Sequence, residues 1–190
     1  GYRSIASMDL KLESVEDFSK IKMSFPSPMS KTIFVKMGAT LVGNISKESI
    51  QTALEKNDIN SYETVSPRYF HNGEYKTAKV LNDLNHNIQF TTIVMNKIFF
   101  KSLTKKEQKI VSDAIFKASQ VERSLAVQVA TEVRINASKL GIAIVKMPDS
   151  EIKKFKDKME SVDWYGIYGI SREFVEKIKS LEVKKLSSNY

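Results

Sequence analysis

The strongest structural signal in the chain is TKKEQKIVSDAIFKASQVERSLAVQVATEVRINASKLG, residues 104–141. Apolar side chains recur there every three or four residues, which predicts one amphipathic helix. Thr104 and Glu107 have the spacing of a capping box, and Gly141 is a suitable residue to end a helix. A helix of roughly 36 residues is about 54 Å long, whereas a compact globule of this size is about 40 Å across. We therefore predict a helix that crosses between two lobes or enters a coiled coil, although its many alanines disfavour the coiled coil.

The residues before this helix alternate between short strands and helices. Strands are expected at 3–6, 21–25, 39–42 and 59–63, and helices from Ser14, over 29–37 and over 46–57. This order is typical of an α/β fold with a mostly parallel sheet. On both sides of the long helix we expect strands at 88–95 and 141–145, helices at 150–162 and 171–181, and an aromatic loop at 164–169.

Composition excludes several classes of protein. The 190 residues contain no cysteine and only two histidines, so disulfide frameworks, zinc–cysteine sites, thiol catalysis and a histidine-rich metal site are not expected. No stretch is long and apolar enough for a membrane-spanning helix. The first residue is Gly1 and no apolar leader is visible, so a processed or truncated product is one interpretation.

The net charge of +8 is unevenly distributed. Residues 1–86 carry 11 Lys and Arg against 10 Asp and Glu, whereas residues 87–190 carry 19 against 12. Most of the excess lysines alternate with acidic residues on predicted helices, which favours a solvated helix face over a nucleic-acid site. The alternative is an interaction module whose basic C-terminal half binds an acidic protein, a membrane surface or nucleic acid.

Catalytic motifs are missing from the sequence. It has no G-x-S-x-G elbow, no phosphate-binding loop and no dinucleotide fingerprint. We interpret His71 and His86 as surface or hinge hydrogen-bonding residues, and we expect no cofactor and no metal. The chain is therefore predicted to bind something rather than to be an enzyme.

Several segments, in their order along the chain, carry a family resemblance. They are Gly1-Tyr-Arg3, Asp17-Phe-Ser-Lys-Ile-Lys-Met-Ser-Phe-Pro26, Pro26-Ser-Pro28, Gly38-Ala39, Ile50-Gln-Thr-Ala-Leu-Glu55, Asn85-His86, Leu103-Thr-Lys-Lys-Glu-Gln-Lys-Ile110 and Pro148-Asp149. In this order they resemble the C-terminal part of the solute-binding proteins of tripartite ATP-independent periplasmic (TRAP) transporters, the DctP-type family. No single segment is specific; the serial agreement carries the resemblance.

The resemblance implies a fold and a function. The fold is an α/β clamp of two lobes, similar to the type II periplasmic binding proteins, which closes on a small organic acid. Residues 1–190 would form one incomplete solute-binding domain without the first lobe. Within this domain, residues 1–86 would supply the strand–helix units of the ligand lobe. Residues 87–190 would supply a crossover strand, the lobe-spanning helix and the C-terminal helices. Such proteins act in the periplasm and deliver their ligand to membrane permease subunits.

Candidate ligand contacts follow from matching positions. The family's arginine that grips the ligand carboxylate corresponds to Ser24, and its ligand-facing asparagine corresponds to Thr64, which follows Tyr62 in the same stretch. Arg3 is the one cationic position retained. Arg68 and Lys47 are further cations near these positions.

Two interpretations of these differences stay open. In the first, a diverged binder uses Arg3 together with Arg68 or Lys47 to hold a different anion. In the second, the chain is a fragment or relic whose pocket no longer closes. A salt bridge at a hinge would equally explain Arg3, and ordinary strand packing would explain Tyr62 and Thr64.

Overall fold

A six-stranded sheet forms the centre of the protein in the computed structural model, which describes residues 1–24, 27–43 and 45–180, without the side chains of Lys47 and residues 178–180. The strands lie in the order β3-β2-β4-β1-β5-β6. Their bounds are β1 Arg3–Ser7, β2 Lys22–Met23, β3 Thr40–Leu41, β4 Ser61–Val65, β5 Val80–Asn82 and β6 Ala143–Val145. The predicted α/β class is confirmed, and a strand lies within or beside each of the expected positions except 88–95.

The direction of β1 corrects the prediction of a mostly parallel sheet. β1 pairs antiparallel with both β4 and β5, while β2–β3, β2–β4 and β5–β6 are parallel pairs. The sheet is therefore mixed, with one central strand that runs against the other five. Apolar patterns locate strands along a chain but do not encode the direction in which each strand enters the sheet.

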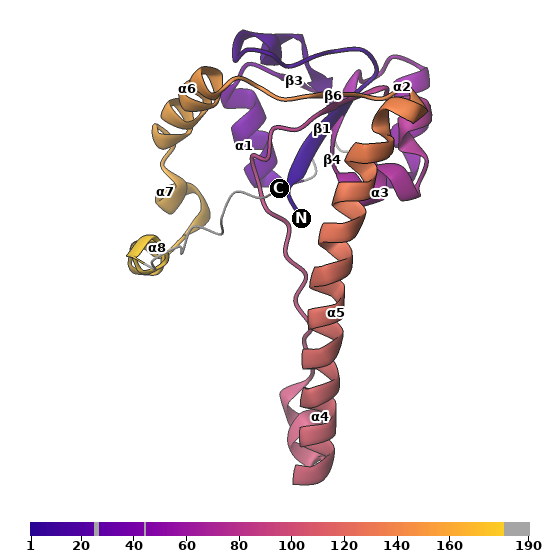
Figure 1. Ribbon diagram of the computed structural model, residues 1–190. Helices are drawn as coiled ribbons and strands as arrows, with labels where there is room; N and C mark the ends of the chain where they lie inside the picture. The colour runs from indigo at the N-terminus through magenta and orange to yellow at the C-terminus, as the bar shows by residue number, and fades with distance from the viewer. Residues whose placement is uncertain (25–26, 44, 181–190) are drawn as a thin grey trace.

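Helices cover both faces of the sheet (Figure 1). They are α1 Pro28–Lys36, α2 Ile50–Glu55, α3 Ser66–His71, α4 Lys97–Ser102, α5 Lys105–Ala137, α6 Asp149–Glu160, α7 Trp164–Tyr168 and α8 Arg172–Ser180, with 3-10 helices η1 Glu16–Lys20, η2 Lys47–Ser49, η3 Glu74–Lys76 and η4 Ser138–Leu140. The expected aromatic loop at 164–169 is wrong, because Asp163 caps the short helix α7 by accepting a hydrogen bond from the Gly166 amide. The helix expected from Ser14 is only the 3-10 helix η1.

Two apolar clusters hold these layers together. One lies between the sheet and α1, η1 and α6, and includes Ile5, Phe18 and Phe34. The other lies between the opposite face and α2, α3 and the end of α5, and includes Ala6, Tyr62 and Tyr69. Because neighbouring residues of a strand point to opposite faces, Ile5 and Ala6 belong to different clusters.

The long helix α5 is confirmed, and most of it lies outside both clusters. Thr104 and Glu107 form the predicted capping box. Val133 and Ala137, near the C-terminal end of α5, are its only buried residues in the described part of the chain. Figure 1 shows the rest of the helix extending far from the sheet toward α4.

Residues 88–95 are not the strand that their β-prone sequence predicts. Their first two residues, Ile88 and Gln89, belong to a short antiparallel ribbon, in which the Arg3 amide donates to the Asn87 carbonyl at 2.7 Å and the Gln89 amide donates to the Gly1 carbonyl at 2.8 Å. A single bridge joins Tyr2 to Ile88, and beyond it no strand is paired with this segment among the described residues. β-propensity becomes a strand only when a neighbouring strand supplies hydrogen-bond partners.

Hydrogen exchange tests whether the exposed part of α5 is less stable than the part that packs on the sheet. Amides in 105–125 lie in an exposed helix without a buried side chain, whereas most of the stability of a helix in a protein comes from tertiary packing of its apolar face. Amides in 133–137 lie where the helix packs on the sheet. We expect the first group to exchange at least about 100-fold faster than the second, as mass spectrometry of deuterated peptides would measure. Equal protection along the whole helix would contradict this division.

Candidate functional site

One edge of the sheet gathers the polar residues that the sequence singles out. The strands β2, β3, β4, β5 and β6 all end at this edge, and β1 begins there, because Arg3 pairs with Val65 at the end of β4. The Arg134 guanidinium contacts Asp83, just past the end of β5, at 2.8 Å, so the residues of α5 that precede Arg134 lie beyond the edge. Ligands of open α/β sheets commonly bind at the ends of parallel strands. We call this region the strand-end edge.

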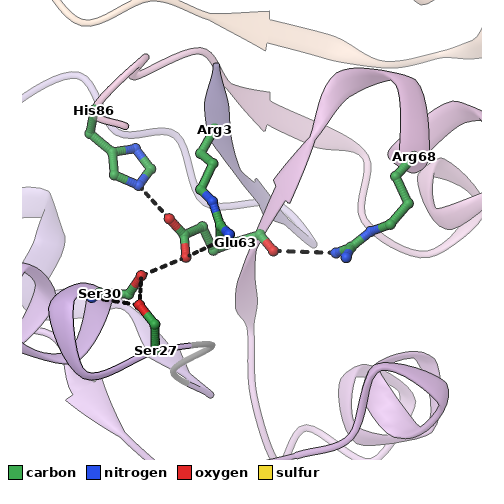
Figure 2. A network of polar contacts seen from close by, with 6 residues as sticks. All are labelled: Arg3, Ser27, Ser30, Glu63, Arg68 and His86. Carbon is green, nitrogen blue, oxygen red and sulfur yellow. Dashed lines mark hydrogen bonds and ion pairs between the residues drawn. The ribbon is translucent and has the colours of Figure 1, made fainter. Parts of the chain in front are cut away.

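Glu63 of β4 is the centre of a buried polar network (Figure 2). Its carboxylate accepts hydrogen bonds from the Arg3 guanidinium at 2.9 Å and the Ser30 hydroxyl at 2.9 Å, and it contacts His86 Nε2 at 2.7 Å. The side chains of Glu63 and His86 are fully buried. Ser30 lies at the start of α1, where Ser27 caps the helix, so the network ties β1, β4, α1 and the segment after β5 together.

The contacts around Glu63 favour its charged form. Burial raises the pKa of the Glu63 carboxyl, but the hydrogen bond with His86, the charge of the Arg3 guanidinium and the Ser30 hydroxyl together outweigh burial and lower it. A buried carboxylate with a guanidinium partner and several hydrogen bonds meets the usual condition for burying a charge. Arg3 is therefore engaged by the protein itself, in an ion pair that matches the salt-bridge interpretation.

Glu74 of η3 forms a second polar cluster on the opposite face of the sheet. Its carboxylate accepts hydrogen bonds from the Tyr62 hydroxyl at 2.8 Å and the Thr64 hydroxyl at 3.2 Å, and Arg68 Nε lies 3.4 Å from it. Burial raises the pKa of the Tyr62 hydroxyl, and the neighbouring Glu74 charge raises it further, so Tyr62 is a neutral donor. The structure thus brings together three predicted site residues, Tyr62, Thr64 and Arg68.

Ser24 and Lys47 lie apart from both clusters. The Ser24 hydroxyl donates to the Gly43 carbonyl at 3.1 Å and accepts from the Ile45 amide at 2.9 Å. These bonds connect the end of β2 to the residues that follow β3. Lys47 begins η2, and its side chain lies outside the described part of the structure. A ligand role for these two residues, as for Arg3, Tyr62, Thr64 and Arg68, stays a prediction.

The roles of Glu63, Glu74 and Ser30 were not predicted from the sequence, and His86 was predicted to lie at the surface or at a hinge. The interpretation of His86 as a hydrogen-bonding residue is right, but its side chain is buried, not at the surface. One signal was available for Glu63: in an alternating strand it points away from Tyr62 and Thr64, toward the face of Arg3. No comparable pattern marks Glu74, which begins the 3-10 helix η3 between α3 and β5.

The described residues offer neither a metal site nor a membrane-spanning helix. Among residues 1–24, 27–43 and 45–180, no group of three or more His, Asp and Glu side chains could hold a metal ion. Over the same ranges, every helix is too short or too polar to cross a bilayer. A hollow of about 340 Å³ lies between α1, α6 and α7, with Met29, Ile33, Phe155 and Trp164 in its mostly apolar lining.

The chain is similar to a known family of proteins over most of its length. The sequence model of the DctP family, described as bacterial extracellular solute-binding protein family 7, matches residues 1–164. This chain belongs to the DctP family. A protein described as uncharacterized from Haemophilus influenzae is 24% identical over 189 residues, which are 99% of this chain and 55% of that protein.

Solved structures of TRAP periplasmic solute-binding proteins share the fold of this DctP-family chain. The Ochrobactrum anthropi protein has a TM-score of 0.84 at 19% identity and covers 94% of this chain and 56% of its own. The Pseudomonas putida F1 protein with bound D-glucuronate has a TM-score of 0.82 at 22% identity, with 98% and 59% covered. The ectoine-binding protein of Halomonas elongata has a TM-score of 0.80 at 20% identity, with 94% and 58% covered.

These likenesses confirm the family and the α/β fold of the TRAP binding proteins. Members of the family bind solutes and are not enzymes. The DctP-family chain described here spans between half and three fifths of the length of these relatives. It therefore corresponds to an incomplete clamp.

Proposed function

We propose that this chain is one lobe of the extracytoplasmic solute-binding component of a TRAP-type uptake transporter. The complete clamp binds a small organic acid in the periplasm and delivers it to membrane permease subunits. The observation that carries the proposal is the strand-end edge, in a fold shared with TRAP binding proteins. Arg3 and Thr64 lie at the ends of strands there, and Arg68 lies in α3, directly after β4. Structural neighbours were solved with orotic acid, galacturonate and glucuronate bound, which supports an organic acid as the ligand class.

The unit that completes the clamp is a second α/β lobe. The side chains that this second lobe would cover are exposed and apolar, and we call them the apolar surface. They are Ile88, Phe90, Ile93, Val94, Met95, Ile98, Phe99, Ile110, Phe116, Val121 and Leu125. Exposed apolar surface of this extent is typical of an interface. In this proposal residues 1–86 provide the ligand lobe, and residues 87–190 provide the connection to the second lobe and the C-terminal helices. Contacts from both lobes to one ligand would favour the closed clamp.

The proposed ligand contacts of this lobe are the six residues expected from the sequence. They are Arg3, Ser24, Lys47, Tyr62, Thr64 and Arg68. The alternative, an interaction module with a basic C-terminal half, gains little support from the structure, because Lys153 and Lys154 of α6 are paired with Asp157 and Glu151. Intrahelical pairs of this kind are typical of a solvated helix face.

A ligand screen tests the proposed function. We expect at least one of D-glucuronate, D-galacturonate and orotate to raise the melting temperature of the chain in a concentration-dependent way, because a ligand that binds only the folded state stabilises it. Binding at the strand-end edge should also shift backbone NMR signals of 62–68. An absence of any shift, together with salt-sensitive retention on heparin, would instead favour the interaction module.

A further inference from the structure

We propose that the strand-end edge of this lobe contacts an uncharged part of the solute, and that the carboxylate of the bound acid points away from it. This inference rests on the proposed function and specifies how the ligand is oriented. It follows because the charges of both arginines at the edge are already compensated by acidic side chains of the chain itself, Arg3 by Glu63 and Arg68 by Glu74.

Arg3 is the first neutralised cation. Its guanidinium donates to the Glu63 carboxylate at 2.9 Å, and Glu63 is fully buried while 24% of the Arg3 side chain is exposed. The imidazole of His86 contacts the same carboxylate through Nε2, and no described residue forms a hydrogen bond with its Nδ1. A hydrogen bond from this ring to the carboxylate places a proton on Nε2. The Arg3 guanidinium is compensated by the Glu63 carboxylate, so Arg3 and Glu63 together carry no net charge.

Arg68 is the second neutralised cation. Its Nε lies 3.4 Å from the Glu74 carboxylate, and its Nη2 lies 3.4 Å from the Glu63 backbone carbonyl, as Figure 2 shows for the latter contact. Tyr62 and Thr64 donate their hydroxyl protons to Glu74. The hydroxyls therefore have no proton left to donate to an anionic ligand.

Ser24 provides no charge, and both of its hydrogen-bonding functions are in use. Its proton goes to the Gly43 carbonyl, and its oxygen accepts from the Ile45 amide. An arginine at such a position could hold a carboxylate with two parallel bonds, whereas a serine with both functions occupied cannot.

The chemistry of the edge follows from these three arrangements. An incoming carboxylate would approach two arginines whose charges are compensated, and it would also approach the carboxylates of Glu63 and Glu74. Hydroxyl, amide or carbonyl groups add no charge, and they can use the remaining guanidinium N–H groups of Arg3 and Arg68. The edge is therefore suited to a polyhydroxy or amide-bearing part of the solute.

A pair of probes that differ only in charge tests the inference. D-glucuronate and D-glucuronamide share one sugar ring, but the first carries a carboxylate and the second a neutral amide. Their affinities for the full chain and for Glu74→Gln and Glu63→Gln can be measured by NMR titration. Asp113→Asn is the matched control, because it removes one negative charge from an exposed pair with Lys109 on α5.

We expect the wild-type chain to bind both probes with affinities within about threefold of each other. Glu74→Gln should increase the preference for glucuronate about tenfold, because Arg68 would then be free to form a charged hydrogen bond with the carboxylate. Glu63→Gln should act in the same direction, and Asp113→Asn should leave the ratio unchanged. A wild-type preference for glucuronate of tenfold or more, or an unchanged ratio in Glu74→Gln, would overturn the orientation while leaving the proposed function intact. Binding of neither probe to any of these proteins would overturn the orientation, and it would overturn the proposed function as well if D-galacturonate and orotate also leave the melting temperature unchanged.

Discussion

Replacing Glu63 with alanine is expected to lower the free energy of unfolding by about 3–5 kcal/mol, the usual cost of removing one partner of a buried charge pair. The substitution leaves the Arg3 guanidinium without its carboxylate, and it leaves His86 Nε2 and the Ser30 hydroxyl without their buried partner. Four segments of the fold meet at this carboxylate, so the loss is not confined to one element. Urea unfolding followed by circular dichroism measures the effect as a lower midpoint.

Two companion variants separate the buried network from general effects of charge. Asp113→Asn breaks an exposed pair between Lys109 and Asp113 and should change stability by less than about 1 kcal/mol. Glu63→Gln keeps the shape and two hydrogen-bonding atoms of the side chain, so its effect should lie between the two. A loss of less than about 1 kcal/mol in Glu63→Ala would show that the network contributes little to stability.

The pH dependence of stability provides a second measure of the same carboxylate. Because the pKa of Glu63 is lower in the folded protein than in the unfolded chain, its contribution is fully present above the unfolded pKa. That contribution is lost as the pH falls through the folded pKa. The wild-type chain should therefore lose stability in acid more steeply than Glu63→Ala, in which the group is absent.

The extent to which the sequence predicts the fold depends on how local each signal is. The capping box at Thr104 and the apolar repeat up to Gly141 act within single turns of one helix, and the structure confirms both. The direction of β1 depends on strands some 60 to 80 residues away in the chain, and no local pattern specifies it. The segment 88–95 shows the same limit, because its strand propensity has no effect without a paired neighbour.

The candidate site was predictable to a smaller extent. Arg3, Thr64 and Arg68 do lie at or near the strand-end edge, and Tyr62 shares the Glu74 carboxylate with Thr64, but the acidic groups that engage these residues were not anticipated. Glu74 becomes a partner of Arg68 and Tyr62 only because the chain turns back toward β4 between α3 and η3. Positions taken from a family identify where a ligand contact could lie, but they do not tell whether the side chain is already occupied.

The apolar surface leads to the prediction with the other large expected effect. The isolated chain should self-associate at micromolar concentration, because Phe90, Val94, Ile98 and Phe116 are between 63% and 83% exposed. Changing these four residues to serine should raise the concentration at which association is half complete by at least about tenfold, since each removed side chain takes away part of the apolar area that association buries. Sedimentation velocity across a concentration series measures this midpoint.

A matched variant shows whether the effect belongs to this surface or to exposed apolar residues in general. Val35, Ile167 and Phe174 are between 54% and 60% exposed, and none of them belongs to the apolar surface or to α5. Changing these three to serine also removes exposed apolar area, yet it should leave the association midpoint within about twofold, because their area is divided among separate elements. An equal effect of both variants would contradict a dedicated interface. A monomeric wild-type chain at all concentrations would show that the apolar surface can stay in water, and the second lobe of the clamp would then need another docking surface.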